Sequence, residues 1–193
     1  MLILASTSRY RRELLSRLGL AFEVHAPQVD ETALPGETPR RLAERLALAK
    51  AEAVAATHAD AVVIGSDQTA TLDGAQVIGK PGTHERAVAQ LRAASGRTLV
   101  FHTGLAVVAT SRGFRKVSVV DTRVRFRALS DAQIEAYLAR EPAYDCAGSA
   151  KSEGLGIALI AALEGSDPSA LVGLPLIELT SALEAAGCPV LQP

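Results

Sequence analysis

The pattern of apolar and polar positions changes between strand-like and helix-like segments along the chain. Short apolar runs at 2–5, 61–65 and 99–108 predict strands. Residues 118–128 alternate, which predicts a half-exposed strand that pairs with 99–108 through the turn at 111–113. One face of this strand carries Val120, Val124 and Phe126, and the other carries Asp121, Arg123, Arg125 and Arg127.

Four amphipathic helices are predicted where a start signal precedes periodic apolar residues. Strands that alternate with such helices are typical of an α/β architecture with a mixed sheet. No repeat, low-complexity tract or long linker divides the 193 residues, so we expect residues 1–193 to form one domain. The helix signals are Thr38 with Pro39, Thr83, Ser130 with Gln133, and Pro175, and Gly187 is expected to end the last helix.

Composition excludes several classes of protein. Apolar residues make up 48% of the chain and charged residues 21%, which is typical of a globular protein rather than a disordered or fibrous one. Twenty basic and 21 acidic residues give a net charge of −1, so the overall charge offers no footprint for nucleic acid or an anionic membrane. Any phosphate chemistry must therefore come from a local cluster of charges.

The cysteines and the N-terminal sequence bear on the compartment. Cys146 and Cys188 have neither disulfide-framework nor zinc-ligand spacing, so we expect two reduced, partly buried thiols. The chain opens on Leu2-Ile3-Leu4 without a basic leader, and no apolar run approaches the length of a membrane span. We therefore expect a cytoplasmic protein.

The first candidate binding segment is a Ser/Thr-rich turn between the first strand and a helix. Arg9, Arg11 and Arg12 crowd the start of this helix, where the macrodipole disfavours cations by a few tenths of a kcal/mol each, roughly, and favours anions. A bound anion would explain the arrangement. Helical spacing places Arg11 on the stripe of Leu14 and Leu15, pointing along the sheet edge rather than into bulk water. Solvated arginines on an ordinary surface helix remain the alternative.

Acidic residues and a lysine supply further candidates. Asp30 and Glu31 lie in a loop, where adjacent acids are most often simply solvated. Asp67 follows the apolar run 61–65 and is expected at the carboxyl end of that strand, where ligands bind in open α/β sheets. It can ligate Mg²⁺ or orient a water, or it can be an ordinary turn residue. Lys50 lies near the edge of the apolar stripe of its helix, where it can also merely extend from the core margin.

Two glycine-containing loops complete the set. Residues 74–80 match the first part of a P-loop, but Pro81 replaces the required Ser or Thr, which excludes a Walker-type ATPase. Lys80 remains as a point charge in a rigid turn, and we expect core packing to need neither Lys80 nor Arg11. The loop at 148–156 is suited to wrapping a ligand closely. No HExxH or GxSxG motif is present, so zinc-protease and serine-hydrolase functions have little support.

Taken together and in order, these segments resemble the Maf family of nucleoside triphosphate pyrophosphatases over essentially the whole chain. The match is closest to the subgroup that acts on 7-methyl-GTP, through Tyr10, Gln68 and the segment 146–154 that carries Glu153. One departure is Arg9, where the family usually has proline. The motifs are Leu4-Ala5-Ser6-Thr7-Ser8, Arg11-Arg12, Asp30-Glu31, Arg45-Leu46-Ala47, Lys50-Ala51, Gly65-Ser66-Asp67, Gly79-Lys80-Pro81, Ser95-Gly96 and Thr103-Gly104.

The resemblance implies a fold, a reaction and a set of roles. The fold is an elongated mixed sheet flanked by helices, of the Maf/ITPase-like type, with two lobes around a cleft, and it can form a homodimer. Water attacks the α-phosphorus and pyrophosphate leaves, with a divalent cation (Mg²⁺, Mn²⁺ or Co²⁺) as cofactor. The alternatives are a dTTP/UTP pyrophosphatase of the same family and a non-enzymatic nucleotide-sensing regulator of septum formation. The implied roles are Arg11, Lys50 and Lys80 on the triphosphate, Glu31 and Asp67 on the metal, Asp67 as catalytic residue, and Tyr10, Gln68 and Glu153 on the base.

Overall fold

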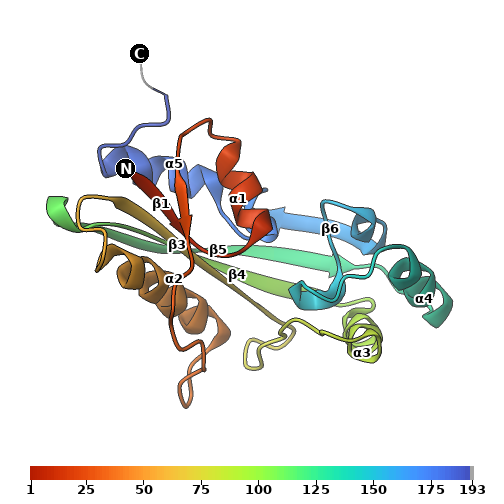
Figure 1. The fold of residues 1–193 in the computed structure, drawn as a ribbon. Coiled ribbons are helices and arrows are strands. Elements are labelled where there is room, and N and C mark those ends of the chain that lie inside the picture. Colours follow the sequence, from red (N-terminus) through yellow and green to blue (C-terminus); the bar gives the residue numbers. More distant parts are fainter. Residues whose placement is uncertain (192–193) are drawn as a thin grey trace.

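The computed structural model describes residues 1–191, and its centre is a single six-stranded sheet (Figure 1). The strand order is β2-β1-β3-β4-β5-β6. β1 (Leu2–Ala5) pairs in parallel with β2 (Glu23–His25) and with β3 (Val62–Thr71). The remaining neighbours are antiparallel, namely β3, β4 (Thr98–Ala109), β5 (Phe114–Phe126) and β6 (Ile160–Gly165). The predicted α/β fold with a mixed sheet is confirmed.

Five α-helices flank the sheet, and their start signals act as the sequence predicts. The side chains of Thr38, Thr83 and Ser130 each accept a backbone N–H, and Ser130 with Gln133 forms the predicted capping box. Pro175 immediately precedes the last helix, and Gly187 follows it with a positive φ of 76°. The helices are α1 (Arg9–Ser16), α2 (Pro39–Ala55), α3 (His84–Ala94), α4 (Asp131–Arg140) and α5 (Leu176–Ala185).

The prediction that a strand ends at Gly65 is wrong. β3 continues to Thr71, because residues 66–71 keep pairing with β4 after β1 has ended opposite Gly65. Asp67 is therefore in the middle of a strand and not at its carboxyl end. On the side that β1 leaves open, residues 66–71 form a sheet edge, which carries a single bridge between Ala70 and Ile78 within the described chain.

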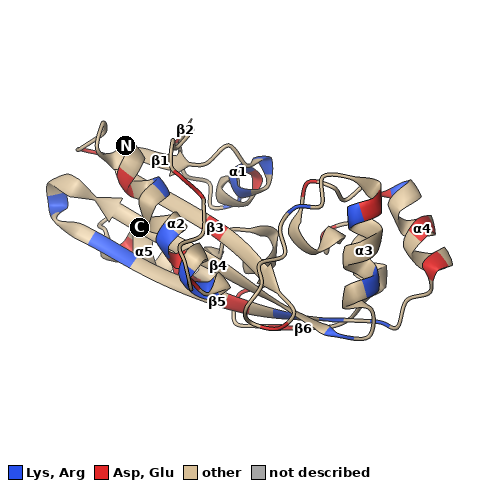
Figure 2. Cartoon of the chain, turned by 90° about the horizontal axis from the view of Figure 1, so that it is seen from below, with Lys and Arg blue, Asp and Glu red and all other residues tan. Residues whose placement is uncertain are grey.

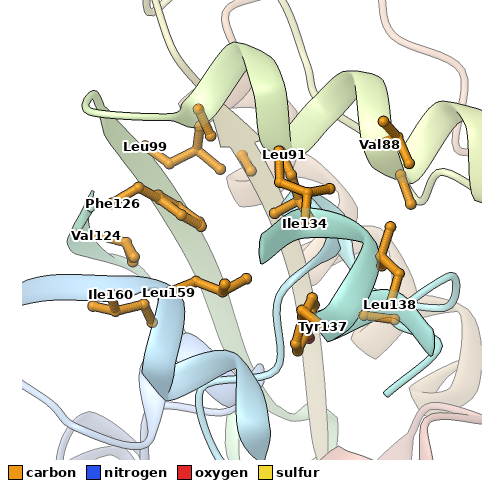
Figure 3. Packing of buried hydrophobic residues seen from close by; sticks show 14 of the residues in the cluster. Val88, Leu91, Leu99, Val124, Phe126, Ile134, Tyr137, Leu138, Leu159 and Ile160 are labelled. Carbon is orange, nitrogen blue, oxygen red and sulfur yellow. The ribbon is translucent and has the colours of Figure 1, made fainter. Parts of the chain in front are cut away.

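The helices divide the molecule into two lobes along the sheet (Figure 1). In the first lobe, α2 covers one face of the sheet, and α1 and α5 cover the opposite face. In the second lobe, α3 and α4 pack against the far end of the long strands, where Leu91, Leu99, Phe126, Ile134 and Leu138 meet in one apolar core (Figure 3). Acidic and basic residues are interspersed over both lobes (Figure 2), in keeping with the near-neutral net charge.

No helix within residues 1–191 has the length and apolar character needed to cross a membrane.

The contact between α2 and the sheet is unusually close at two glycines. A Cβ on Gly65 would lie 2.7 Å from the backbone nitrogen of Ala51, and a Cβ on Gly104 would lie inside van der Waals contact with the carbonyl oxygen of Ala43. The alanines of α2 that face the sheet, Ala43, Ala47 and Ala51, are fully buried. The helix can therefore lie directly on β3 and β4 only because neither strand carries a side chain at these positions.

We predict that Gly104→Ala lowers the free energy of unfolding by about 1–3 kcal/mol, the usual cost of forcing extra atoms into a packed core. The added methyl group must push α2 away from the sheet. Urea unfolding of the variant and the wild type measures the loss. Gly79→Ala is the matched control, because a Cβ there meets nothing within 4 Å and its φ is not positive. Equal stability of Gly104→Ala and wild type would show that α2 can shift without cost.

Candidate active site

A cleft of about 740 Å³ opens along the edge that β3 presents beyond the end of β1. One wall comes from the turn after β1 and from α1, and the other comes from segments of the second lobe that include residues 145–147 and 150–153. All eight residues singled out in the sequence line this one cleft, although they come from six separate parts of the chain. They are Tyr10, Arg11, Glu31, Lys50, Asp67, Gln68, Lys80 and Glu153. Their roles remain predictions.

Lys50 lies at the centre of the cleft's charged end and joins the two candidate acids. Its Nζ is 2.6 Å from Oε1 of Glu31 and 2.6 Å from Oδ1 of Asp67. The prediction that Lys50 lies at the margin of the apolar stripe is wrong, because the residue is only 6% exposed and belongs to the buried face of α2. A buried ammonium needs paired charges, and the two carboxylates supply them.

The ammonium of Lys50 retains capacity for a further ligand. A lysine has three N–H donors, and the two carboxylates use two of them. One donor is left for a phosphate oxygen. Lys50 is therefore paired with both acids and keeps one donor beyond them.

The loop that carries Glu31 is fixed to α2 by an ion pair that the sequence analysis missed. Nε and Nη2 of Arg45 donate to the two carboxylate oxygens of Glu37 at 2.7 and 2.8 Å, and Nη2 also donates to the carbonyl oxygen of Thr32 at 3.0 Å. The hydrogen bonds from Arg45 lower the pKa of Glu37 to about 2. Arg45 belongs to the motif that marked the family, but its partner could not be read from spacing, since eight residues separate the pair.

Arg11 is held at the rim of the same charged end. Its Nε donates to the carbonyl oxygen of Gly173 at 2.8 Å, and the hydroxyl of Ser66 donates to the same oxygen at 2.9 Å. Burial lowers the pKa of Arg11, whereas the negative charges of Asp67 and Glu31 act in the opposite direction. The guanidinium is therefore held against the backbone at Gly173 and not in bulk water, as predicted. The expectation that core packing does not need Arg11 stays a prediction, and this hydrogen bond gives it a test.

Lys80 differs from Arg11 in its surroundings. It is exposed in the turn after Ile78, and no ion pair of its side chain occurs within residues 1–191. Its charge is therefore free to meet an anion in the cleft.

Tyr10 and Gln68, two of the three candidate base-binding residues, already form hydrogen bonds within the protein. Tyr10 donates its hydroxyl to Oδ2 of Asp145 at 2.9 Å, and Asp145 also accepts Nζ of Lys151 at 2.9 Å. Burial acts to raise the pKa of Asp145, but the hydrogen bonds from Lys151 and Tyr10 outweigh it, so its pKa lies below the usual range. Glu153 is exposed on the wall that the second lobe contributes. The sequence analysis missed Asp145, which lies next to Cys146 without any motif of its own.

Gln68 is held by β4 and by the segment at 170–171. Its Nε2 donates to Oγ1 of Thr103 at 2.9 Å and to the carbonyl oxygens of Ala170 and Leu171 at 3.0 and 3.1 Å. The amide nitrogen is therefore committed to the protein, and only the amide oxygen is left for a ligand.

The carboxylates of Glu31 and Asp67 suit a divalent cation that arrives with a polyphosphate. No group of three or more His, Cys, Asp and Glu side chains is placed to hold a metal by itself in the described part of the chain. Magnesium, however, is commonly bound by one or two carboxylates together with substrate phosphates and water. Two carboxylates within 2.6 Å of one Nζ provide such a pair of oxygen donors.

The part of the cleft where Arg11 and Lys50 lie with Glu31 and Asp67 has the side-chain types that bind phosphate-bearing anions. The chain belongs to the Maf family, since the family model described as "Maf-like protein" matches residues 1–186.

Several curated relatives share most of the chain. A protein of Polaromonas sp. is 63% identical over 96% of this chain and 84% of its own. Proteins of Nitrosococcus oceani and Albidiferax ferrireducens are 60% and 59% identical, each over 98% of this chain and 95% of its own. All three are named 7-methyl-GTP pyrophosphatase. Among solved structures, the Staphylococcus aureus Ham1 protein matches with a TM-score of 0.48 and 17% identity over 66% of this chain and 72% of that one.

We predict that Arg11→Ala and Lys80→Ala differ in their effect on stability. Arg11→Ala removes a charge-assisted hydrogen bond to Gly173 and should lower the free energy of unfolding by about 1.5–3 kcal/mol. Lys80→Ala should stay within about 0.5 kcal/mol of wild type, as exposed substitutions usually do. Urea unfolding gives both values, and titration with a non-hydrolysable nucleoside triphosphate should show weaker binding in both variants. Equal stability of the two variants would show that the contact of Arg11 with Gly173 contributes nothing.

Proposed function

We propose that this protein hydrolyses 7-methyl-GTP to 7-methyl-GMP and pyrophosphate. The observation that carries the proposal is the pairing of Lys50 with both Glu31 and Asp67 in a cleft that Arg11 and Lys80 also line. The curated relatives with this name are 59–63% identical to the chain and cover nearly all of it, which supports the choice of substrate.

The cations account for binding of the triphosphate. Arg11, Lys80 and the third donor of Lys50 all line the cleft and can each meet a phosphate oxygen of the substrate. The N-terminal end of α1, which also borders the cleft, adds backbone N–H groups and the positive end of its dipole. Arg11 and Lys50 are held by their contacts with Gly173, Glu31 and Asp67 before the substrate arrives, so they stabilise the charge that builds up on the phosphates with little reorganisation.

Hydrolysis breaks the bond between the α-phosphorus and the oxygen that bridges it to the β-phosphorus. The oxygen of a water forms a new bond to the α-phosphorus, the bridging oxygen leaves with its electron pair on pyrophosphate, and the water proton passes to Asp67. Lys50 holds the Asp67 carboxylate in one position for this transfer through its 2.6 Å contact.

Glu31 and Asp67 would hold a divalent cation together with oxygens of the substrate. When bound, such an ion supplies positive charge to the phosphates and makes a neighbouring water more acidic. Nζ of Lys50 lies 2.6 Å from an oxygen of each carboxylate and limits the movement of both.

The base is proposed to bind between the walls of Tyr10 and Glu153. Methylation at N7 gives guanine a positive charge, and an aromatic ring attracts a cation with about 0.5–2 kcal/mol, depending on desolvation. Tyr10 offers the ring, and the carboxylate of Glu153 can accept the N1–H and 2-amino donors. Gln68, tied by its amide nitrogen, shapes the wall near the nucleoside.

We predict that purified protein releases pyrophosphate from 7-methyl-GTP with a higher kcat/KM than from GTP, dTTP or UTP. The reaction should need Mg²⁺, Mn²⁺ or Co²⁺, and a chelator should abolish it reversibly. Pyrophosphate measured over this panel is the test, and Glu153→Gln should reduce the ratio of 7-methyl-GTP to GTP. Preference for dTTP and UTP would assign the chain to the other subgroup of the family. Binding of triphosphates without pyrophosphate release under any metal would favour a nucleotide sensor.

We predict that Asp67→Asn lowers kcat by about 10²- to 10⁴-fold, the range for loss of a positioned acid–base group. The amide oxygen can still accept a hydrogen bond from Lys50, so the protein should stay folded by circular dichroism. Asp60→Asn is the matched control, because Asp60 is exposed and outside the cleft. Nearly full activity of Asp67→Asn at saturating metal would remove Asp67 from the mechanism.

A further inference from the structure

The ring of Tyr10 already has two cations near it, with Nζ of Lys151 at 6.0 Å from the ring centroid and the guanidinium of Arg9 closer. The guanidinium carbon of Arg9 lies 4.7 Å from the ring centroid, and Nη2 of Arg9 donates to the Tyr10 hydroxyl at 2.8 Å. The distance is well within the roughly 6 Å over which a ring attracts a cation. Arg9 therefore occupies a position that a positively charged base would also take.

Arg9 is the loosely held member of the group around Tyr10. Its side chain is 62% exposed, and its ion pair with Asp145 is long, at 3.7 Å. Exposed ion pairs of this kind contribute little. Lys151 is only 15% exposed and holds the same carboxylate at 2.9 Å. If Arg9 moves away, Asp145 keeps both Lys151 and the Tyr10 hydroxyl, so the ring stays in place.

The charges around the Tyr10 ring favour a cationic base over a neutral one as the group that replaces Arg9. A neutral guanine gains little by replacing a guanidinium on an aromatic face, whereas a cationic, N7-methylated guanine restores the same attraction. Once Arg9 has left, Asp145 faces the incoming base with one cationic partner fewer.

We propose that Arg9 determines how strongly the protein prefers a cationic base, because its guanidinium competes with that base for the ring of Tyr10. The proposal rests on the proposed function and adds a residue to its base-binding site. Arg9 acts on the base through Tyr10 and takes no part in the chemistry at the phosphates. Removing its charge should thus strengthen the preference for N7-methylated guanine.

The test compares wild type with Arg9→Gln on two pairs of ligands. The kcat/KM ratio of 7-methyl-GTP to GTP should rise about two- to fivefold, the factor that corresponds to one cation–π contact at an exposed site. Calorimetric titration with 7-methyl-GMP and GMP should show a rise of the same size in the ratio of their affinities. Arg17→Gln, at the other end of α1, is the matched control for the lost charge and should leave both ratios unchanged.

A second background separates this competition from a general loss of anion attraction. In Tyr10→Ala, which has no ring to compete for, adding Arg9→Gln should not change either ratio. A general loss of attraction would lower both members of each pair equally. Unchanged or reduced ratios in Arg9→Gln alone would overturn the proposal. If no triphosphate is cleaved, the proposed function fails, and the titration with the two monophosphates still decides the role of Arg9.

Discussion

The buried ammonium of Lys50 is the constraint on which the site depends. A lysine that is 6% exposed is stable in its charged form only when carboxylates compensate the lost hydration. Those carboxylates come from the loop before α2 and from the middle of β3. The charge therefore ties three separate segments to one point. If either Glu31 or Asp67 were removed, only one carboxylate would compensate the buried charge of Lys50. The two ion pairs of Lys50 therefore stabilise the arrangement of the three segments as well as the site.

The contact between Lys50 and Asp67 depends in turn on how closely α2 packs against β3 and β4. Asp67 pairs across the sheet with Gly104, and Gly65 lies two residues before Asp67 on the same face of β3. Both glycines let α2 lie against the strands, with Ala43, Ala47 and Ala51 at the contact. A side chain at either glycine would raise the helix and lengthen the 2.6 Å contact between Lys50 and Asp67. The glycines of the Gly-Ser-Asp and Thr-Gly motifs thus determine the geometry of the acid without contacting a ligand.

Local features of this fold could be predicted from the sequence, and features that depend on distant pairing could not. Thr38, Thr83 and Ser130 cap helices as expected, because a cap involves only the following three residues. The continuation of β3 beyond Gly65 was missed, because its pairing with β4 involves residues 29 to 39 positions away. The burial of the Lys50 side chain was also missed, because its partners Glu31 and Asp67 are distant from it in the sequence. The cytoplasmic location, the homodimer and the single-domain boundary at 1–193 stay predictions.

The eight residues placed in the cleft were selected by motif order, and the structure adds a segment that holds two of them, Arg11 and Gln68. Carbonyl oxygens of residues 170–173 accept hydrogen bonds from Arg11, Ser66, Gln68 and Thr103. No pattern in the sequence points to this segment, because it acts through backbone atoms that every residue possesses.

The anchoring of that segment bears on how Gln68 can affect specificity. Asp167, which is 2% exposed, accepts the backbone N–H groups of Ser169 and Ile177 at 2.9 and 2.7 Å, and so fixes both ends of the segment to the start of α5. The amide nitrogen of Gln68 donates hydrogen bonds to the same segment. A substitution of Gln68 that removes the amide would therefore release the carbonyl of Leu171, whereas the carbonyl of Ala170 would keep the hydroxyl of Thr103, and the wall would move at Leu171. Its effect on substrate choice would come from this movement as much as from any contact of its own with the base.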